Sequence, residues 1–172
     1  MAVTTQDMLA YIRATFSTRL AGRPAAPPPQ ALADLPSQGC FVSLKTRGGT
    51  LRGCIGTLAP ARGSLAEELA ENAMAAALKD PRFKPVQAHE LSTLVISVDL
   101  LTPPGPVEDP ALLDPRKHGV VVRSGSRCGV LLPDLPGVDT LAQQVGICRE
   151  KARIPADAPV ALECFTVERF GE

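Results

Sequence analysis

Hydrophobic side chains recur with helical spacing in three stretches of this 172-residue chain. The first stretch predicts an amphipathic helix over residues 5–20, with Thr4 or Thr5 as its N-cap. The last stretch predicts a helix that begins at Asp139 or Thr140. The hydrophobic positions that define these two helices are Met8, Leu9, Ile12, Phe16, Leu20, Leu141, Val145, Ile147 and Cys148.

The middle stretch is rich in alanine and begins with a capping-box pattern. Ser64 and Glu67 are three residues apart, so each side chain can accept a hydrogen bond from the other residue's backbone N–H. We expect this helix to continue to Lys79 and to end before Pro81, because the residue before a proline avoids the helical conformation. Glu67 is assigned to the cap and Glu68 to the solvated face of the helix.

Other segments have the alternating or β-branched pattern of strands. Two hairpins are expected, with turns at Arg47-Gly48-Gly49 and Ser124-Gly125-Ser126. Proline-rich segments 23–36 and 102–115 are expected to be extended connections without regular structure. The predicted strands are residues 40–45, 50–55, 90–101, 119–122, 128–132 and 160–170.

This order of elements predicts an α+β protein with a mainly antiparallel sheet flanked by helices. The two segments that start at Gly39 and Gly119 resemble each other, since each is a hairpin followed by a loop and a helix. Their internal spacing differs, so the repeat is weak. We expect one domain over residues 1–172, in which the two repeated parts leave a groove between them, a usual place for a binding site.

Composition narrows the classes of function. Lys plus Arg and Asp plus Glu both number 18, and this balance argues against a protein that binds nucleic acid by neutralising phosphates. No apolar run is long enough for a transmembrane helix, and no secretory signal is present, so we expect a cytoplasmic protein without membrane contact. The five cysteines lack the spacing of a zinc or redox pair, and neither a metal nor a cofactor is expected.

Residues 51–56, Leu-Arg-Gly-Cys-Ile-Gly, are the main candidate site. In an extended strand, Arg52 and Cys54 project from one face and the apolar residues from the other. A cation beside Cys54 would favour the reactive thiolate, which makes Cys54 the catalytic candidate. The alternative is that Cys54 is a small buried residue of the core.

Arg52 presents a second choice between a site and a structural contact. Its guanidinium can capture an anion next to the backbone N–H groups of Gly53 and Gly56, or it can form an ordinary surface salt bridge. Arg82, which follows the middle helix, is expected to bind carbonyl groups or an acidic partner, with Phe83 in the core.

His89 and His118 complete the set of candidate ligand-binding residues. They are the only side chains of the chain that ordinarily act as a general base near neutral pH. Either would matter only if the fold brings it close to Cys54. The chain contains no P-loop, dinucleotide-binding, HExxH or GxSxG pattern, so the common cofactor and hydrolase functions have no support.

Residues 51–56 resemble the hallmark of the AMMECR family, the A protein of the AmmeMemoRadiSam system. Further matching segments are Asp80-Pro81-Arg82-Phe83, Glu90-Leu91, Leu101-Thr102-Pro103, His118-Gly119 and residues 129–133. The resemblance implies an α+β fold of two unequal subdomains with a cleft between them. It also implies association with a Memo-type protein and a radical-SAM protein, but it does not supply a reaction.

Two departures from the family pattern lie in the C-terminal part. A Trp is expected before the last helix, and this chain has none. The family's Lys-Ala-Gly-Leu helix exit appears as Lys151-Ala152-Arg153-Ile154, without the Gly.

Three functions remain open. The chain binds a small anionic or electrophilic ligand in a cleft at residues 51–56, it is a non-catalytic interaction module in which Cys54 is structural, or it is a thiol-dependent enzyme that uses Cys54. The Arg-x-Cys pair favours chemistry at this site. The absence of a recognisable acid–base set favours binding.

Overall fold

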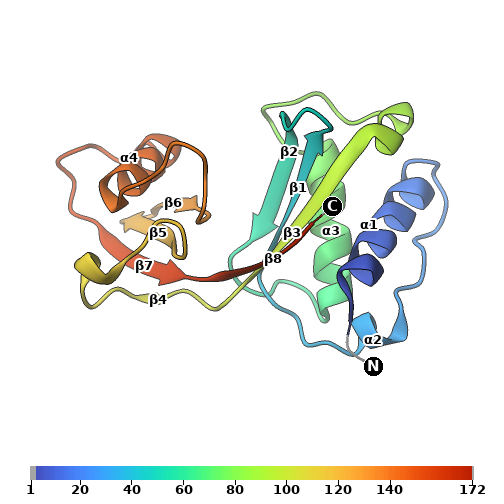
Figure 1. Ribbon diagram of the computed structural model, residues 1–172, viewed down its shortest axis with the longest axis horizontal. Helices are drawn as coiled ribbons and strands as arrows, with labels where there is room; N and C mark the ends of the chain where they lie inside the picture. Colours follow the sequence, from blue (N-terminus) through green and yellow to red (C-terminus); the bar gives the residue numbers. More distant parts are fainter. Residues whose placement is uncertain (1–2, 172) are drawn as a thin grey trace. The chain divides into compact units, whose positions relative to one another are not determined.

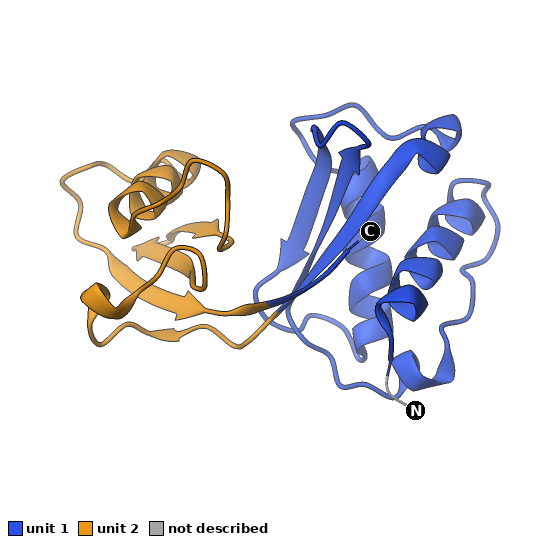
Figure 2. Ribbon diagram, viewed as in Figure 1, with its two compact units in different colours: residues 1–100, 168–172 blue, residues 101–167 orange. Residues whose placement is uncertain are grey.

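The structure is a computed structural model that describes residues 3–171 and divides them into two compact units (Figure 2). Unit 1 contains the chain up to Leu100 and again from Glu168, and unit 2 contains Leu101–Val167. Each unit is a four-stranded sheet with helices packed against it. The predicted α+β class with mainly antiparallel pairing is therefore confirmed.

In unit 1 the sheet has the strand order β2-β1-β3-β8. Helix α3 packs on β1 and β2, and α1 packs on α3 (Figure 1). The core lies between the helices and the sheet, where Ile12, Val42, Leu69 and Ile96 are fully buried. The elements of this unit are α1 (Thr5–Arg19), α2 (Gln30–Ala33), β1 (Cys40–Thr46), β2 (Leu51–Thr57), α3 (Leu65–Leu78), η1 (Ala88–Thr93), β3 (Leu94–Leu101) and β8 (Val167–Gly171).

Unit 2 has the strand order β4-β7-β5-β6, and α4 packs on β5 and β6. Its smaller core includes Val120, Val122 and Cys148. Thr140 is the N-cap of α4 and forms a full capping box with Gln143. The elements are β4 (Gly105–Pro106), η2 (Pro110–Leu112), β5 (Gly119–Ser124), β6 (Arg127–Leu131), α4 (Leu141–Ala152) and β7 (Ala161–Phe165).

The two units repeat one strand order. In each, a hairpin is followed by a helix and a third strand, and a fourth strand completes the sheet beside the third. The fourth strand comes from the other half of the chain, because β3 is followed by β4 of unit 2 and β7 is followed by β8 of unit 1. Thr102 and Thr166, which follow β3 and β7, bond to each other: the N–H of Thr102 donates to Thr166 O at 3.0 Å.

Three local predictions were wrong. The single strand predicted over residues 160–170 is divided at Thr166 into β7 and β8, which belong to different sheets. The strand predicted from residue 90 begins at Leu94, because residues 88–93 form the 3₁₀ helix η1. The connections at residues 23–36 and 102–115 were expected to lack regular structure, but the first contains the short helix α2 and the second contains β4 and η2.

The middle helix differs in its first turn. Ser64 Oγ accepts from the N–H of Glu67, as predicted, but the Glu67 carboxylate accepts from the N–H of Gly63 and not from that of Ser64. Glu68, assigned to the solvated face, is only 1% exposed. Its carboxylate accepts hydrogen bonds from Thr57 Oγ1, from Ser37 Oγ and from the N–H groups of residues 61 and 62, so it is a buried structural anchor.

Candidate functional site

Strand β2 is an edge strand whose glycines are required by packing. A Cβ added at Gly53 would lie 2.2 Å from the backbone oxygen of Ala76 in α3, and one at Gly56 would lie 2.3 Å from the ring of Phe41. Ile55 packs against the core of unit 1. Because side chains alternate along a strand, Gly53 and Ile55 face the helix, and Cys54 projects from the other face.

Cys54 lies directly opposite Ser43 of β1. Ser43 Oγ donates a hydrogen bond to Cys54 Sγ at 3.2 Å. The backbone N–H and carbonyl groups of Cys54 point away from β1, toward Asp80 and Arg82. Residues whose backbone groups point away from the partner strand form the closer type of antiparallel pair, which explains the contact between the two side chains.

Asp80 and Arg82 cover the free edge of β2 at Cys54. The Asp80 carboxylate accepts from the N–H of Cys54 at 2.9 Å and from Nε and Nη2 of Arg82 at 2.9 and 2.7 Å. Arg82 Nη2 also donates to the carbonyl of Cys54 at 3.4 Å. Unpaired groups of an edge strand favour association with other strands, and these contacts satisfy two of them.

This ion pair has one buried and one exposed partner. The side chain of Asp80 is 2% exposed, whereas that of Arg82 is 53% exposed. The hydrogen bonds from Arg82 are the main cause that lowers the pKa of Asp80 to about 2. Phe83 is half-buried beneath the guanidinium, and its ring centre lies 5.4 Å from Arg82 Cζ. The prediction that Phe83 lies in the core was therefore wrong.

Burial raises the pKa of the Cys54 thiol, while the bond from Ser43 and the charge of Arg82 act in the opposite direction. The net shift is opposite to the one that an activated thiolate needs. The surroundings of Cys54 therefore favour the protonated thiol over the thiolate.

The other four cysteines divide by burial. Cys40 and Cys148 are buried, and burial raises the pKa of their thiols to about 12 and about 11. Cys128 is exposed and Cys164 is half-buried. All five thiols are free of disulfides, and Cys128 is the accessible one against which the reactivity of Cys54 can be compared.

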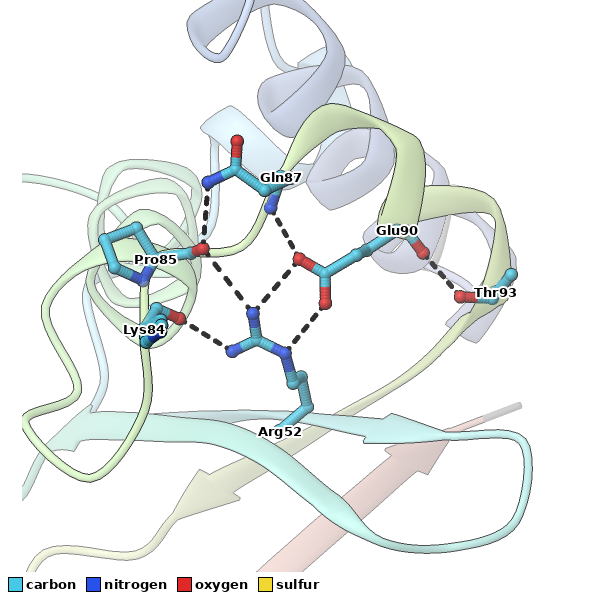
Figure 3. A network of polar contacts seen from close by, with 6 residues as sticks. All are labelled: Arg52, Lys84, Pro85, Gln87, Glu90 and Thr93. Carbon is cyan, nitrogen blue, oxygen red and sulfur yellow. Dashed lines mark hydrogen bonds and ion pairs between the residues drawn. The ribbon is translucent and has the colours of Figure 1, made fainter.

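Arg52 is directed at Glu90 (Figure 3). None of its hydrogen bonds goes to Cys54. Its Nε and Nη2 donate to the two Glu90 carboxylate oxygens at 2.9 and 3.1 Å, and Nη1 donates to Lys84 O at 2.9 Å. Nη2 also reaches Pro85 O at 3.5 Å. Of the two alternatives for Arg52, the salt bridge is the one present, and it attaches the segment after α3 to β2.

Within residues 3–171, neither histidine has a hydrogen bond to Cys54 or Arg82. His89 is an exposed residue of η1, and no hydrogen bond joins it to Cys54. His118 belongs to unit 2, where its Nδ1 accepts from the N–H of Asp114 at 3.0 Å and its carbonyl accepts from Gln144. Of the predicted site residues, Arg82 is therefore the one with a hydrogen bond to Cys54, and neither histidine has such a bond.

Two members of the cluster were missed by sequence reasoning. Ser43 is an ordinary polar residue of a strand and has no pattern of its own. Asp80 had two signals: it belongs to the segment Asp80-Pro81-Arg82-Phe83, which matches the family pattern, and it lies directly before a proline, where the chain must leave the helix.

Residues 3–171 contain no group of three or more His, Cys, Asp or Glu side chains arranged to hold a metal ion. None of the helices within this range is both long and apolar enough to cross a membrane. An open cavity of about 390 Å³ lies in unit 2, lined by Arg116 and residues 134–139, and it includes none of the predicted site residues.

The model of the AMMECR1 family matches residues 9–171, nearly the whole chain. The chain belongs to the AMMECR1 family. A protein of Thermotoga maritima is 52% identical over 133 residues, which cover 77% of this chain and 76% of that protein. A Clostridium acetobutylicum protein is 45% identical over 78% of this chain, but the match covers only 28% of that longer protein.

A solved structure has the same fold. The crystal structure of an uncharacterised protein from Pyrococcus horikoshii has a TM-score of 0.87 and 29% sequence identity, and the match covers 98% of this chain and 91% of that one. A protein of Methanocaldococcus jannaschii is 35% identical over 93% of this chain and 83% of its own length.

Within this AMMECR1-family chain, the unusual helix exit has a structural consequence. Arg153 is the C-cap of α4 and has φ 55° and ψ 40°, the left-handed conformation. Glycine adopts this conformation without a steric penalty, which explains why a glycine is expected there.

Proposed function

We propose that this AMMECR1-family protein binds a small anionic or electrophilic ligand on β2, at Cys54 and Arg82. The observation that carries the proposal is the exposed guanidinium of Arg82, held against Cys54 by the buried carboxylate of Asp80. A guanidinium fixed in this way has already lost the conformational freedom that anion binding would otherwise cost.

The repeat supports a specialised role for this position. A Cβ added at Gly53 or at Gly129 would lie 2.2 Å from a helix carbonyl oxygen in each unit, so β2 and β6 can be aligned in register. The residues of unit 2 that correspond to Cys54 and Ser43 are then Val130 and Val121, which also form a directly opposed pair. Two valines are enough to fill this position in unit 2, so packing alone does not explain the thiol and the hydroxyl found at the same position in unit 1.

Binding is favoured over catalysis. The pKa of Cys54 is raised by burial, and neither His89 nor His118 has a hydrogen bond to Cys54 that could support proton transfer. Arg52 acts in this proposal as the residue that holds the segment carrying Arg82 near β2. The glycines provide the close packing that places the strand.

Anion protection of Cys54 tests the proposal. Alkylation of Cys54 by neutral iodoacetamide is followed by peptide mass spectrometry at mildly alkaline pH, with inorganic phosphate or acetate at constant ionic strength. We expect these anions to slow alkylation of Cys54 several-fold and to leave Cys128, the exposed thiol of unit 2, unaffected. The Arg82→Gln variant should lose the protection.

Equal alkylation of Cys54 with and without anions, or protection that persists in Arg82→Gln, would contradict anion binding at this site. Asp80 is buried, so removal of Arg82 alone leaves a buried charge and destabilises the protein. The Asp80→Asn/Arg82→Gln double variant removes both charges together and keeps the test valid if the single variant does not fold.

From the family resemblance we also propose that the protein acts with a Memo-type protein and a radical-SAM protein. Sedimentation of the purified chain with each protein, and with both, should give a faster-moving complex in at least one mixture. Unchanged sedimentation in all three mixtures would contradict this part of the proposal.

A further inference from the structure

We propose that the ligand bound at Cys54 is a short 2-oxo acid, whose carboxylate binds Arg82 and whose carbonyl carbon adds reversibly to Cys54 Sγ. This inference rests on the proposed function and names the class of ligand. It follows from the contacts of Arg82, from the contacts of Cys54 and from the groups that are missing around the thiol.

The contacts of Arg82 leave one side of the guanidinium available. Nε and Nη2 are used by Asp80 and by the carbonyl of Cys54, whereas no described residue accepts a hydrogen bond from Nη1. Slightly more than half of the side chain is exposed. A planar guanidinium recognises a carboxylate well, and the carboxylate would then lie beside the residue that carries the thiol.

Addition to a carbonyl group suits a thiol that stays protonated. The Sγ–H bond breaks and an Sγ–C bond forms, while the π electrons of the C=O group move to oxygen, which takes up the proton. Ser43 can relay this proton, because its hydroxyl lies 3.2 Å from Sγ and can accept the thiol proton as it donates its own. The product is a thiohemiketal with an uncharged hydroxyl, its carboxylate still paired with Arg82, and no oxidant, reductant or leaving group is required.

Acyl transfer fits these contacts less well. The backbone N–H of Cys54, a natural donor to an oxyanion, is already bonded to the Asp80 carboxylate. None of the hydrogen bonds around Cys54 comes from a histidine that could protonate a leaving group. A reaction that ends with a neutral adduct needs neither group.

Carbon-13 NMR with pyruvate labelled at C2 tests this inference. With the wild-type protein, we expect a new resonance in the range of tetrahedral carbon. Cys54→Ser should abolish it, and Cys128→Ser should leave it unchanged. Arg82→Gln should weaken pyruvate binding by about tenfold, the effect of losing one charge-assisted contact.

Methyl pyruvate, which has no charge, separates the two parts of the site. It should form the adduct equally well with the wild-type protein, with Arg82→Gln and with the Asp80→Asn/Arg82→Gln double variant. The amount of adduct at equilibrium should stay constant across neutral pH, because the addition of a protonated thiol to a carbonyl releases no proton. A rate of formation that rises about tenfold per pH unit would show instead that the thiolate is the attacking group.

The outcomes distinguish this inference from the proposed function. If phosphate protects Cys54 but pyruvate forms no adduct, the ligand class is wrong and the anion site stands. If neither effect occurs, both are wrong. An adduct that survives Cys54→Ser, or pyruvate binding unaffected by Arg82→Gln, would also overturn the inference.

Discussion

Arg153 has a backbone conformation that is unfavourable for any residue with a side chain. It is exposed, has a left-handed backbone conformation and ends α4. A side chain in this conformation brings Cβ close to the backbone, a cost of about 1 kcal/mol that glycine avoids. The hydrogen bond that Arg127 donates to this residue uses the backbone carbonyl at 2.8 Å, so it does not depend on the Arg153 side chain.

We therefore expect Arg153→Gly to stabilise the protein by about 0.5–1 kcal/mol, measured by urea unfolding. Gly146 provides a matched control in the same helix. It lies in the interior of α4, and a Cβ added there meets no atom within 4 Å. Gly146→Ala should also stabilise the protein, by a similar amount, because glycine is unfavourable inside a helix. Destabilisation by Arg153→Gly would show that the arginine side chain contributes more than its backbone conformation costs.

At the scale of elements, the segment after α3 covers the free edge of strand β2. Residues 80–90 are attached to β2 through Asp80 and Arg82 at Cys54, and through Glu90 at Arg52. Val86, which is buried, fixes the middle of the segment, and its N–H donates to Ala77 O at 2.8 Å. The segment thus supplies β2 with polar partners and positions the guanidinium of Arg82.

The Asp80 contacts predict a pH dependence of stability. The pKa of Asp80 is lowered from 3.8 to about 2 in the folded protein, so its contribution is fully present above pH 4 and is lost as the pH falls through 2. A shift of this size corresponds to a stabilisation on the order of 2 kcal/mol. Asp80→Asn should lower the free energy of unfolding by this amount at neutral pH, and the difference should disappear near pH 2.

Urea unfolding at a series of pH values measures this effect. Asp157, an exposed residue of unit 2, is the control, and Asp157→Asn should behave like the wild-type protein at every pH. A constant difference between Asp80→Asn and wild type from neutral to acidic pH would show that the loss is one of packing and not of charge.

For the whole molecule, the exchange of the fourth strands makes each unit depend on a distant part of the chain. Unit 1 is completed by β8, more than sixty residues after β3 in sequence. Arg169 of β8 binds Asp99 of β3, with Nε 2.6 Å from Oδ1. The Asp99 side chain is only 4% exposed, so this contact satisfies a buried carboxylate.

Arg169→Gln should destabilise unit 1 by about 1–3 kcal/mol, because the buried carboxylate of Asp99 then loses its charged partner. Hydrogen exchange followed by mass spectrometry should show faster exchange in β3 and β8 and unchanged exchange in β5 and β6. Glu168→Gln, an exposed change at the preceding residue, is the control and should alter neither set. Equal acceleration in both units would indicate that they unfold together.

The sequence by itself determined the types and order of most elements. Helix α1, both hairpins and α4 were predicted within a few residues, because a hydrophobic face and its capping residues are local patterns. The resemblance at residues 51–56 also identified the family, since those residues are held in place by packing that only glycine permits at Gly53 and Gly56.

The tertiary structure decided which side chains meet. Arg52 is two residues from Cys54 but binds Glu90, whereas Arg82, 28 residues away, donates to the carbonyl of Cys54. In the same way, Glu68 is buried by groups from residues 37, 57, 61 and 62, which no helical pattern reveals. Charge pairing and burial depend on chain segments that come together only on folding, so spacing along the sequence could place Cys54 on a strand but could not identify its partners.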